Sequence, residues 1–116
     1  MAVDKDMNES EQVRNNQPTY ILQAVWFKKP YGSRRYRTYL ESANPIAVKY
    51  GARRLVGLIP KEVIRGDFKP DYVCVIEWPT MEHYYNFLKD PHYQSIAPMR
   101  DEAVEKVITI ECFRIA

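Results

Sequence analysis

The sequence has few of the residues that mark the common catalytic and exported classes. It contains two cysteines, two histidines and four glycines in 116 residues. No apolar run approaches the roughly 20 residues of a membrane span, and the polar start lacks the apolar middle of a secretory signal. We therefore expect no membrane contact, and reduced thiols in the cytoplasm.

The charge balance is close to neutral. Seventeen Lys and Arg against fifteen Asp and Glu leave a formal net charge of +2, whereas a nucleic-acid-binding protein needs a concentrated basic face. The densest basic run, "SRRYR" at residues 33–37, is typical of the solvated side of a helix. We expect no nucleic-acid partner.

Catalytic and metal-binding signatures are also missing. There is no phosphate loop, dinucleotide glycine fingerprint, nucleophile elbow or cysteine–histidine cluster. His83 and His92 do not have the i, i+4 spacing of a ligand pair, and we interpret both as surface residues. Cys74 and Cys112 fall within apolar strands and are interpreted as buried, inert thiols. We expect no metal and no cofactor.

The organisation along the chain is a polar lead-in followed by one folded unit. Residues 1–17 are predicted to be disordered, and residues 18–116 to form a single α+β domain. Apolar alternation and amphipathic spacing predict strand, helix, strand, strand, helix, strand. The expected strands are residues 19–27, 52–66, 72–78 and 107–115, and the expected helices are residues 34–50 and 81–106.

Prolines and polar residues set the expected helix boundaries. Ser33 is predicted to cap the first helix, Pro45 to kink or break it, and Gly51 to end it. In the second helical segment, three features are expected: a cap from Thr80, a break and restart at Asp90-Pro91, and a further interruption at Pro98.

This order of elements is the split-βαβ, ferredoxin-like arrangement, in which helices cover one face of a four-stranded sheet in the order 4-1-3-2. Pro60 lies in the second strand, where it cannot donate a ladder hydrogen bond. That strand therefore belongs at an edge, which is the place that the order 4-1-3-2 assigns to it.

Alternation along the strands separates two sets of side chains. The even-numbered set is almost wholly apolar and is predicted to pack beneath the helices: Tyr20, Leu22, Ala24, Trp26, Tyr72, Cys74, Ile76, Trp78, Ile108, Ile110, Cys112. The odd-numbered set is mixed: Ile21, Gln23, Val25, Phe27, Val73, Val75, Glu77, Val107, Thr109, Glu111, Phe113. This mixed face is too apolar to stay exposed, so we expect a second copy to cover it and form a homodimer.

Glu77 is the charge inside the apolar run "YVCVIEW", residues 72–78. On the mixed face it would lie near Gln23, where a lined cavity is expected. The alternative is that Glu77, near a strand end, reaches water or pairs with an arginine across the rim.

Several motifs in this order and spacing resemble the domain of unknown function (DUF) 1330 family of the dimeric α/β-barrel superfamily. They are "RYRTYLESANPIAVKYGARRLV", "EVIRGDF", "VIEWPT" and "FLKDPHYQSIAPMR". The resemblance covers residues 19–116 and implies a ferredoxin-like protomer whose sheet packs against its twin. The positions that match the family pattern are Tyr36, Tyr39, Pro45, Gly51, Gly66, Glu77, Tyr93, Pro98 and Arg100.

One position departs from that pattern. Relatives commonly carry an arginine where this chain has Gly57, and Arg53 or Arg54 is the candidate replacement. The resemblance supplies no reaction, although the superfamily includes haem-binding proteins, cofactor-independent monooxygenases and isomerase-like enzymes.

The leading hypothesis is a cytoplasmic homodimer that binds a small organic molecule in a cleft beside the dimer-facing side of the sheet. The candidate ligand-binding residues are Gln23, Glu77, Tyr93 and Arg100. Tyr93 and Arg100 have a structural alternative, which is to support the restarted helix. The competing hypothesis is a non-catalytic interaction module with a filled dimer interface. An enclosed space of several hundred Å3 would favour the ligand site.

Overall fold

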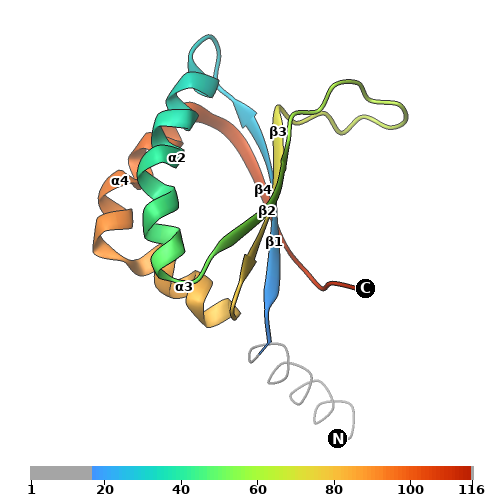
Figure 1. The fold of residues 1–116 in the computed structure, drawn as a ribbon. Coiled ribbons are helices and arrows are strands. Elements are labelled where there is room, and N and C mark those ends of the chain that lie inside the picture. The colour runs from blue at the N-terminus through green and yellow to red at the C-terminus, as the bar shows by residue number, and fades with distance from the viewer. Residues whose placement is uncertain (1–16, 116) are drawn as a thin grey trace, which may run out of the picture.

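The computed structural model describes residues 17–115, so the predicted lead-in lies almost wholly outside the described residues. Within this range the chain forms four strands and three helices in the predicted order (Figure 1). The elements are β1 Thr19–Phe27, α2 Gly32–Lys49, β2 Arg53–Leu58, β3 Tyr72–Trp78, α3 Met81–Lys89, α4 Pro91–Ala103 and β4 Val104–Cys112.

The strands form one antiparallel sheet in the order β2-β3-β1-β4. This is the predicted order 4-1-3-2 read from the other edge, and the ferredoxin-like α+β fold is confirmed. The three helices lie on one side of the sheet (Figure 1). On the other side, called the open face below, no helix of the described chain covers the strands.

The position of β2 at the sheet edge is the one that Pro60 predicted. The strand is shorter than expected, however, because it ends at Leu58. Residues 59–71 form a long loop that projects toward the side away from the helices (Figure 1). Pro60, two residues beyond Leu58, has no backbone N–H to donate to the ladder, so the strand cannot be extended through it.

The start of α2 is set by close packing. The cap predicted at Ser33 is wrong, because α2 begins at Gly32 and has no side-chain cap. A Cβ on Gly32 would lie 2.6 Å from the carbonyl oxygen of Ala103 and 2.9 Å from Cβ of Phe27. Glycine therefore lets the helix start touch both the first strand and the end of α4.

The interruption predicted at Pro98 is wrong, and the break that was one alternative at Pro45 does not occur. Pro45 lies inside α2, which continues through it to Lys49. Pro98 likewise lies inside α4, which continues to Ala103, so that β4 begins at Val104. Each proline removes one backbone donor, but the apolar sides of these helices are held on the sheet, and this tertiary packing keeps the helices continuous.

The boundaries predicted from Thr80, Asp90-Pro91 and Gly51 are confirmed, whereas the last helix ends at Ala103 and not at residue 106. Thr80 caps α3 by accepting from the backbone N of His83 at 3.3 Å. Asp90 caps α4 by accepting from the backbone N of Tyr93 at 3.0 Å, and Pro91 occupies the first turn. Gly51 follows α2 with a φ of +88°, the conformation that glycine adopts at low cost.

The predicted assignment of side chains to the two faces is wrong for β1 and β4. In the observed register Ile21 lies opposite Ile76, and Val25 lies opposite Tyr72. Odd-numbered residues of β1 therefore share a face with even-numbered residues of β3. The helix-covered face carries Ile21, Gln23, Val25, Phe27, Tyr72, Cys74, Ile76, Trp78, Val107, Thr109 and Glu111. The open face carries Tyr20, Leu22, Ala24, Trp26, Val73, Val75, Glu77, Ile108, Ile110 and Cys112.

The layer between the helices and the sheet is rich in aromatic side chains. Phe87 of α3 lies between Trp78 and Tyr93, with ring centroids 5.1 Å and 4.2 Å away. Tyr36 and Tyr39 of α2 extend the cluster, with centroids 5.4 Å apart. Tilted and edge contacts of this kind add to the hydrophobic gain of burial, so the helices are firmly seated on the sheet.

The open face is apolar and partly exposed. Leu58 and Ile110, on the two edge strands, are 55% and 45% exposed. The loop of residues 59–71 and the C-terminal residues project on this same side (Figure 1) and carry Ile64, Phe68 and Phe113 at 95%, 54% and 69% exposure. Such a continuous apolar surface is unusual for a protein that works alone.

Candidate functional site

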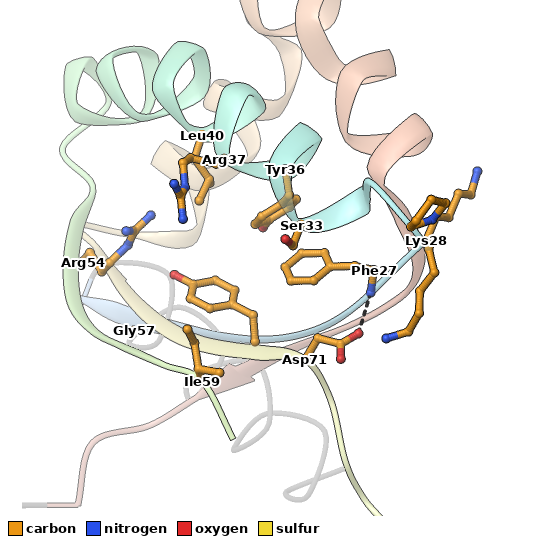
Figure 2. A pocket seen from close by; sticks show the side chains of 13 residues that line it. Phe27, Lys28, Ser33, Tyr36, Arg37, Leu40, Arg54, Gly57, Ile59 and Asp71 are labelled. Atoms are coloured by element: carbon orange, nitrogen blue, oxygen red, sulfur yellow. Dashed lines mark hydrogen bonds between the residues drawn. The ribbon is translucent and has the colours of Figure 1, made fainter. Parts of the chain in front are cut away.

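A cavity of about 740 Å3 lies between the first half of α2 and the helix-covered face of the sheet (Figure 2). Its walls come from the end of β1, the segment that joins β1 to α2, the edge strand β2 and the start of β3. The residues that line it are Phe27, Lys28, Lys29, Pro30, Ser33, Tyr36, Arg37, Leu40, Arg54, Gly57, Ile59, Asp71 and Tyr72.

Asp71 fixes the floor of this cavity. Its Oδ2 accepts a hydrogen bond from the backbone N of Phe27 at 2.8 Å. Its own backbone N donates to the carbonyl oxygen of Val25, also at 2.8 Å. The chain leaving β1 and the chain entering β3 are thus tied together, so the side chains that project from both into the cavity are held in place.

One side of the cavity is an aromatic wall formed by Phe27, Tyr36 and Tyr72. The ring centroid of Tyr36 lies 5.3 Å from that of Phe27 and 6.0 Å from that of Tyr72. Leu40 and Ile59 add aliphatic surface. A mostly apolar lining with a few polar groups is typical of sites that bind small organic molecules.

Tyr72 also brings a hydroxyl group to this wall. Burial raises the pKa of Tyr72 to about 12; nearby Cys74 acts in the same direction and Arg54 acts against it. The phenol is therefore protonated at neutral pH and can donate a hydrogen bond. A Cβ on Gly57 would lie 3.1 Å from this hydroxyl, so the glycine gives the phenol its space.

Two arginines face each other at one end of the cavity. Arg37 projects from α2 and Arg54 from β2, with their guanidinium groups directed toward one another (Figure 2). Arg54 donates to the side-chain oxygen of Asn44 at 3.4 Å. Within residues 17–115 neither guanidinium is in an ion pair.

The register of β2 decides which arginine reaches the cavity. Arg54 lies opposite Ile76 and Gly57 opposite Cys74, both on the helix-covered face, because the register shifts between Arg54 and Val56. Arg53 lies opposite Glu77 on the open face. Of the two arginines considered as replacements for the one missing at residue 57, Arg54 is thus the one placed beside Gly57.

Glu77 is on the open face and does not line the cavity. Its carboxylate lies 3.0 Å from Nη2 of Arg53, and the two side chains are 22% and 69% exposed. The alternative of a rim ion pair with an arginine is confirmed. The placement of Glu77 on one face with Gln23 is wrong, because Gln23 lies opposite Cys74 on the helix-covered face.

Tyr93 and Arg100 are brought together, at the interface of α2 and α4. The hydroxyl of Tyr93 is 2.7 Å from that of Tyr39 and accepts from Nη1 of Arg100 at 3.5 Å. Arg100 also lies 3.7 Å from the carboxylate of Asp101. Neither Tyr93 nor Arg100 lines the cavity. Their ligand contact, like that of Gln23 and Glu77, stays a prediction.

The residues that sequence reasoning missed are Arg37 and Tyr72. Arg37 belongs to the basic run that was interpreted as the solvated side of a helix, and nothing in the sequence distinguishes it from Arg34 and Arg35 of the same run. A signal was present at Arg54, which had been singled out as one of two substitutes for a missing arginine. The register of an edge strand was needed to choose between them.

The two cysteines lie on different faces of the sheet. Both are free thiols; Cys74 is buried and Cys112 is half-buried. Burial raises the pKa of the Cys74 thiol, which leaves it protonated and unreactive at neutral pH. In the sheet, β1 lies between the strands that carry them.

The described chain has neither a metal-binding cluster nor a membrane-spanning helix. Residues 17–115 contain no group of three or more His, Cys, Asp or Glu side chains arranged to hold a metal ion. Nor does any helix in this range combine the length and apolar character that crossing a membrane requires.

The fold is shared with several solved structures. A protein of unknown function from Rhodopseudomonas palustris superposes with a TM-score of 0.81 at 19% identity, over 97% of this chain and 93% of that one. A DABB family protein with a ferredoxin-like fold from Mesorhizobium loti gives 0.62 at 16% identity, over 85% and 98%. A dimeric protein of unknown function with a ferredoxin-like fold from Bacteroides fragilis gives 0.61 at 8% identity, over 82% and 94%.

Identities this low show a common fold and nothing finer. No curated protein is a significant match to the chain. The sequence profile described as "Domain of unknown function (DUF1330)" matches residues 18–112. With nearly the whole described chain inside that match, this protein belongs to the DUF1330 family.

Proposed function

We propose that this protein binds a small organic molecule in the cavity beneath α2 and works as a homodimer in the cytoplasm. The observation that carries the binding proposal is the cavity itself. It has a volume of about 740 Å3, an aromatic wall, and two arginines that face each other at one end (Figure 2). These are the features expected of a preformed ligand site.

The location differs from the one expected from the sequence. The cleft was predicted beside the dimer-facing side of the sheet, whereas the cavity lies on the helix-covered side. The difference follows from the reversed faces of β1 and β4. Because the cavity and the open face lie on opposite sides of the sheet, a second copy can cover the open face without filling the cavity.

The homodimer proposal is supported by the open face. Exposed apolar side chains occupy both edge strands, the loop of residues 59–71 and residue 113. The Bacteroides fragilis protein with this fold is described as dimeric. A second copy packed on the open face would cover this surface, and two-fold association is the commonest assembly of small proteins.

The competing proposal, an interaction module without a ligand, remains distinct. It is favoured by the same open face, and it predicts that the cavity takes up no small molecule. A thermal-shift screen with a library of small metabolites separates the two, since a ligand that binds only the folded state raises the melting temperature.

The screen is made specific by a cavity-filling variant. Ser33 lies on α2 at the cavity, with its hydroxyl directed inward (Figure 2). Ser33→Trp should abolish the thermal shifts, whereas Thr38→Trp, on the same helix but outside the lining, should keep them. If no metabolite shifts the wild type, or if Ser33→Trp retains every shift, the ligand site beneath α2 is excluded.

A further inference from the structure

The charges around the cavity are unbalanced. Four cations line it, Lys28, Lys29, Arg37 and Arg54, against the single carboxylate of Asp71. That carboxylate is already engaged by a backbone N–H at 2.8 Å. The whole chain carries a formal charge of only +2, so this positive charge is a local feature and not a property of the surface as a whole.

The two arginines show where an anion would be held. Arg37 and Arg54 come from different elements and face one another (Figure 2), although like charges repel. Lys28 lies on the far side of the cavity from them (Figure 2) and donates to the backbone carbonyl of Asp101 at 3.0 Å. An anion between the two guanidinium groups would relieve their repulsion, and the planar fork of arginine matches the two oxygens of a carboxylate.

The rest of the lining favours a ligand whose remaining part is flat and apolar. The aromatic wall of Phe27, Tyr36 and Tyr72 runs from the arginine end along the cavity. Aromatic rings prefer offset-stacked or edge contacts with other rings. The Tyr72 hydroxyl adds one donor beside the arginines.

We propose that the ligand is a small aromatic carboxylate whose acid group lies between Arg37 and Arg54 and whose ring packs on the aromatic wall. This inference rests on the proposed ligand site beneath α2 and names the class of molecule that the site takes. The acid group provides the attraction at one end, and the ring provides apolar contact along the wall.

The test uses two compounds of the same ring and similar shape, one with a charged carboxylate and the other with a neutral amide in its place. Titration calorimetry is run on the wild type with 2-naphthoate and with its neutral analogue 2-naphthamide. We expect 2-naphthoate to bind and 2-naphthamide to bind at least about tenfold more weakly, since an anion held by arginine forms charge-assisted hydrogen bonds. Raising the salt concentration should weaken the naphthoate complex.

Three variants locate the acid group. Arg37→Gln and Arg54→Gln should each weaken 2-naphthoate binding by about tenfold or more and leave 2-naphthamide unchanged. Arg35→Gln, an exposed arginine of α2 outside the lining, is the matched control and should bind both compounds as the wild type does. The melting temperatures of all three establish that they are folded.

Each contrary result has a defined meaning. Equal binding of the amide, or naphthoate binding that survives both glutamine variants, overturns the aromatic carboxylate while the cavity remains a ligand site if Ser33→Trp abolishes the binding. Absence of binding by either compound at millimolar concentration overturns the ligand class, and the metabolite screen then decides the proposed function separately. Loss of the dimer in Arg37→Gln and Arg54→Gln would show that the arginines hold a second copy, which also overturns it.

Discussion

The hydroxyl of Tyr39 lies 2.7 Å from the hydroxyl of Tyr93, and this buried hydrogen bond joins α2 to α4. Arg100 adds a longer contact to Tyr93 at 3.5 Å. The link holds α2, the helix that forms one side of the cavity, against the helix beside it. The position and the stability of the candidate site therefore depend on the Tyr39–Tyr93 hydrogen bond, which lies outside the site.

Tyr39→Phe should lower the free energy of unfolding by about 1 kcal/mol, because it removes one buried hydrogen bond and leaves the Tyr93 hydroxyl with only the arginine. Denaturant unfolding measures the change. Tyr85→Phe is the control, since Tyr85 is 51% exposed and should unfold as the wild type does. Equal effects of the two substitutions would show that the Tyr39–Tyr93 bond contributes nothing.

Most of the fold could be predicted from local patterns. Strands β1 and β3 were predicted with their observed ends, and Pro60 placed β2 at an edge. Pro45 and Pro98 were misleading signals for helix boundaries. A proline destabilises an isolated helix, but these two helices stay continuous because they pack on the rest of the fold. The residues around each proline do not indicate this tertiary packing.

The candidate site depended on information of another kind. Alternation within a strand is local, but which parity of β1 shares a face with which parity of β3 depends on register. Thr19 lies opposite Trp78, so the shared parity is reversed between these strands. Without the register, Gln23 and Glu77 were placed together, and the cleft was predicted on the side of the sheet opposite to the cavity beneath α2.

Asp90 should make stability depend on pH in the acid range. Hydrogen bonds from the Tyr50 hydroxyl at 2.6 Å, and then from the backbone N of Tyr93, hold the pKa of Asp90 below its ordinary value. A lowered folded pKa means that the unfolded chain binds the proton first, so the stabilisation is present above the unfolded pKa and is lost as pH falls through the folded pKa.

The variant Asp90→Asn tests this dependence, because asparagine also caps helices but does not titrate. The stability advantage of the wild type over Asp90→Asn should be largest near neutral pH and shrink as pH falls below about 4. Urea unfolding at a series of pH values measures it. A constant difference across the series would show that this carboxylate is not linked to folding.

Gly51 and Gly66 form a matched pair for backbone strain. Both have a positive φ, +88° and +96°. A Cβ on Gly51 would lie 2.5 Å from Cγ of Pro79, whereas one on Gly66 would meet nothing within 4 Å. Gly66→Ala should cost about 1 kcal/mol for the conformation alone, and Gly51→Ala should cost more because the proline must also move. Equal losses of unfolding free energy in Gly51→Ala and Gly66→Ala, measured with denaturant, would show that the contact with Pro79 adds no cost.

With the ligand in the cavity beneath α2, Glu77→Gln should leave both folding and ligand binding almost unchanged. Its partner Arg53 is 69% exposed, and exposed ion pairs of this kind contribute about 0–1 kcal/mol. Because Glu77 is outside the cavity lining, ligand-induced thermal shifts should match those of the wild type, whereas Arg54→Gln should reduce them. Loss of the ligand-induced thermal shifts in Glu77→Gln would instead indicate a ligand site on the open face.

Val75→Asp should separate the proposed dimer into folded monomers. Val75 lies between Leu22 and Val56 on the open face, where a second copy would bury it, and an unpaired carboxylate in an apolar interface is costly. Val48→Asp is the control, because Val48 lies on α2, away from the open face, and is 65% exposed. Light scattering after size exclusion gives the mass of each variant, and circular dichroism shows that each is folded. A wild type that runs as a monomer, or a Val75→Asp variant that stays dimeric, would mean that the open face is not where two copies meet.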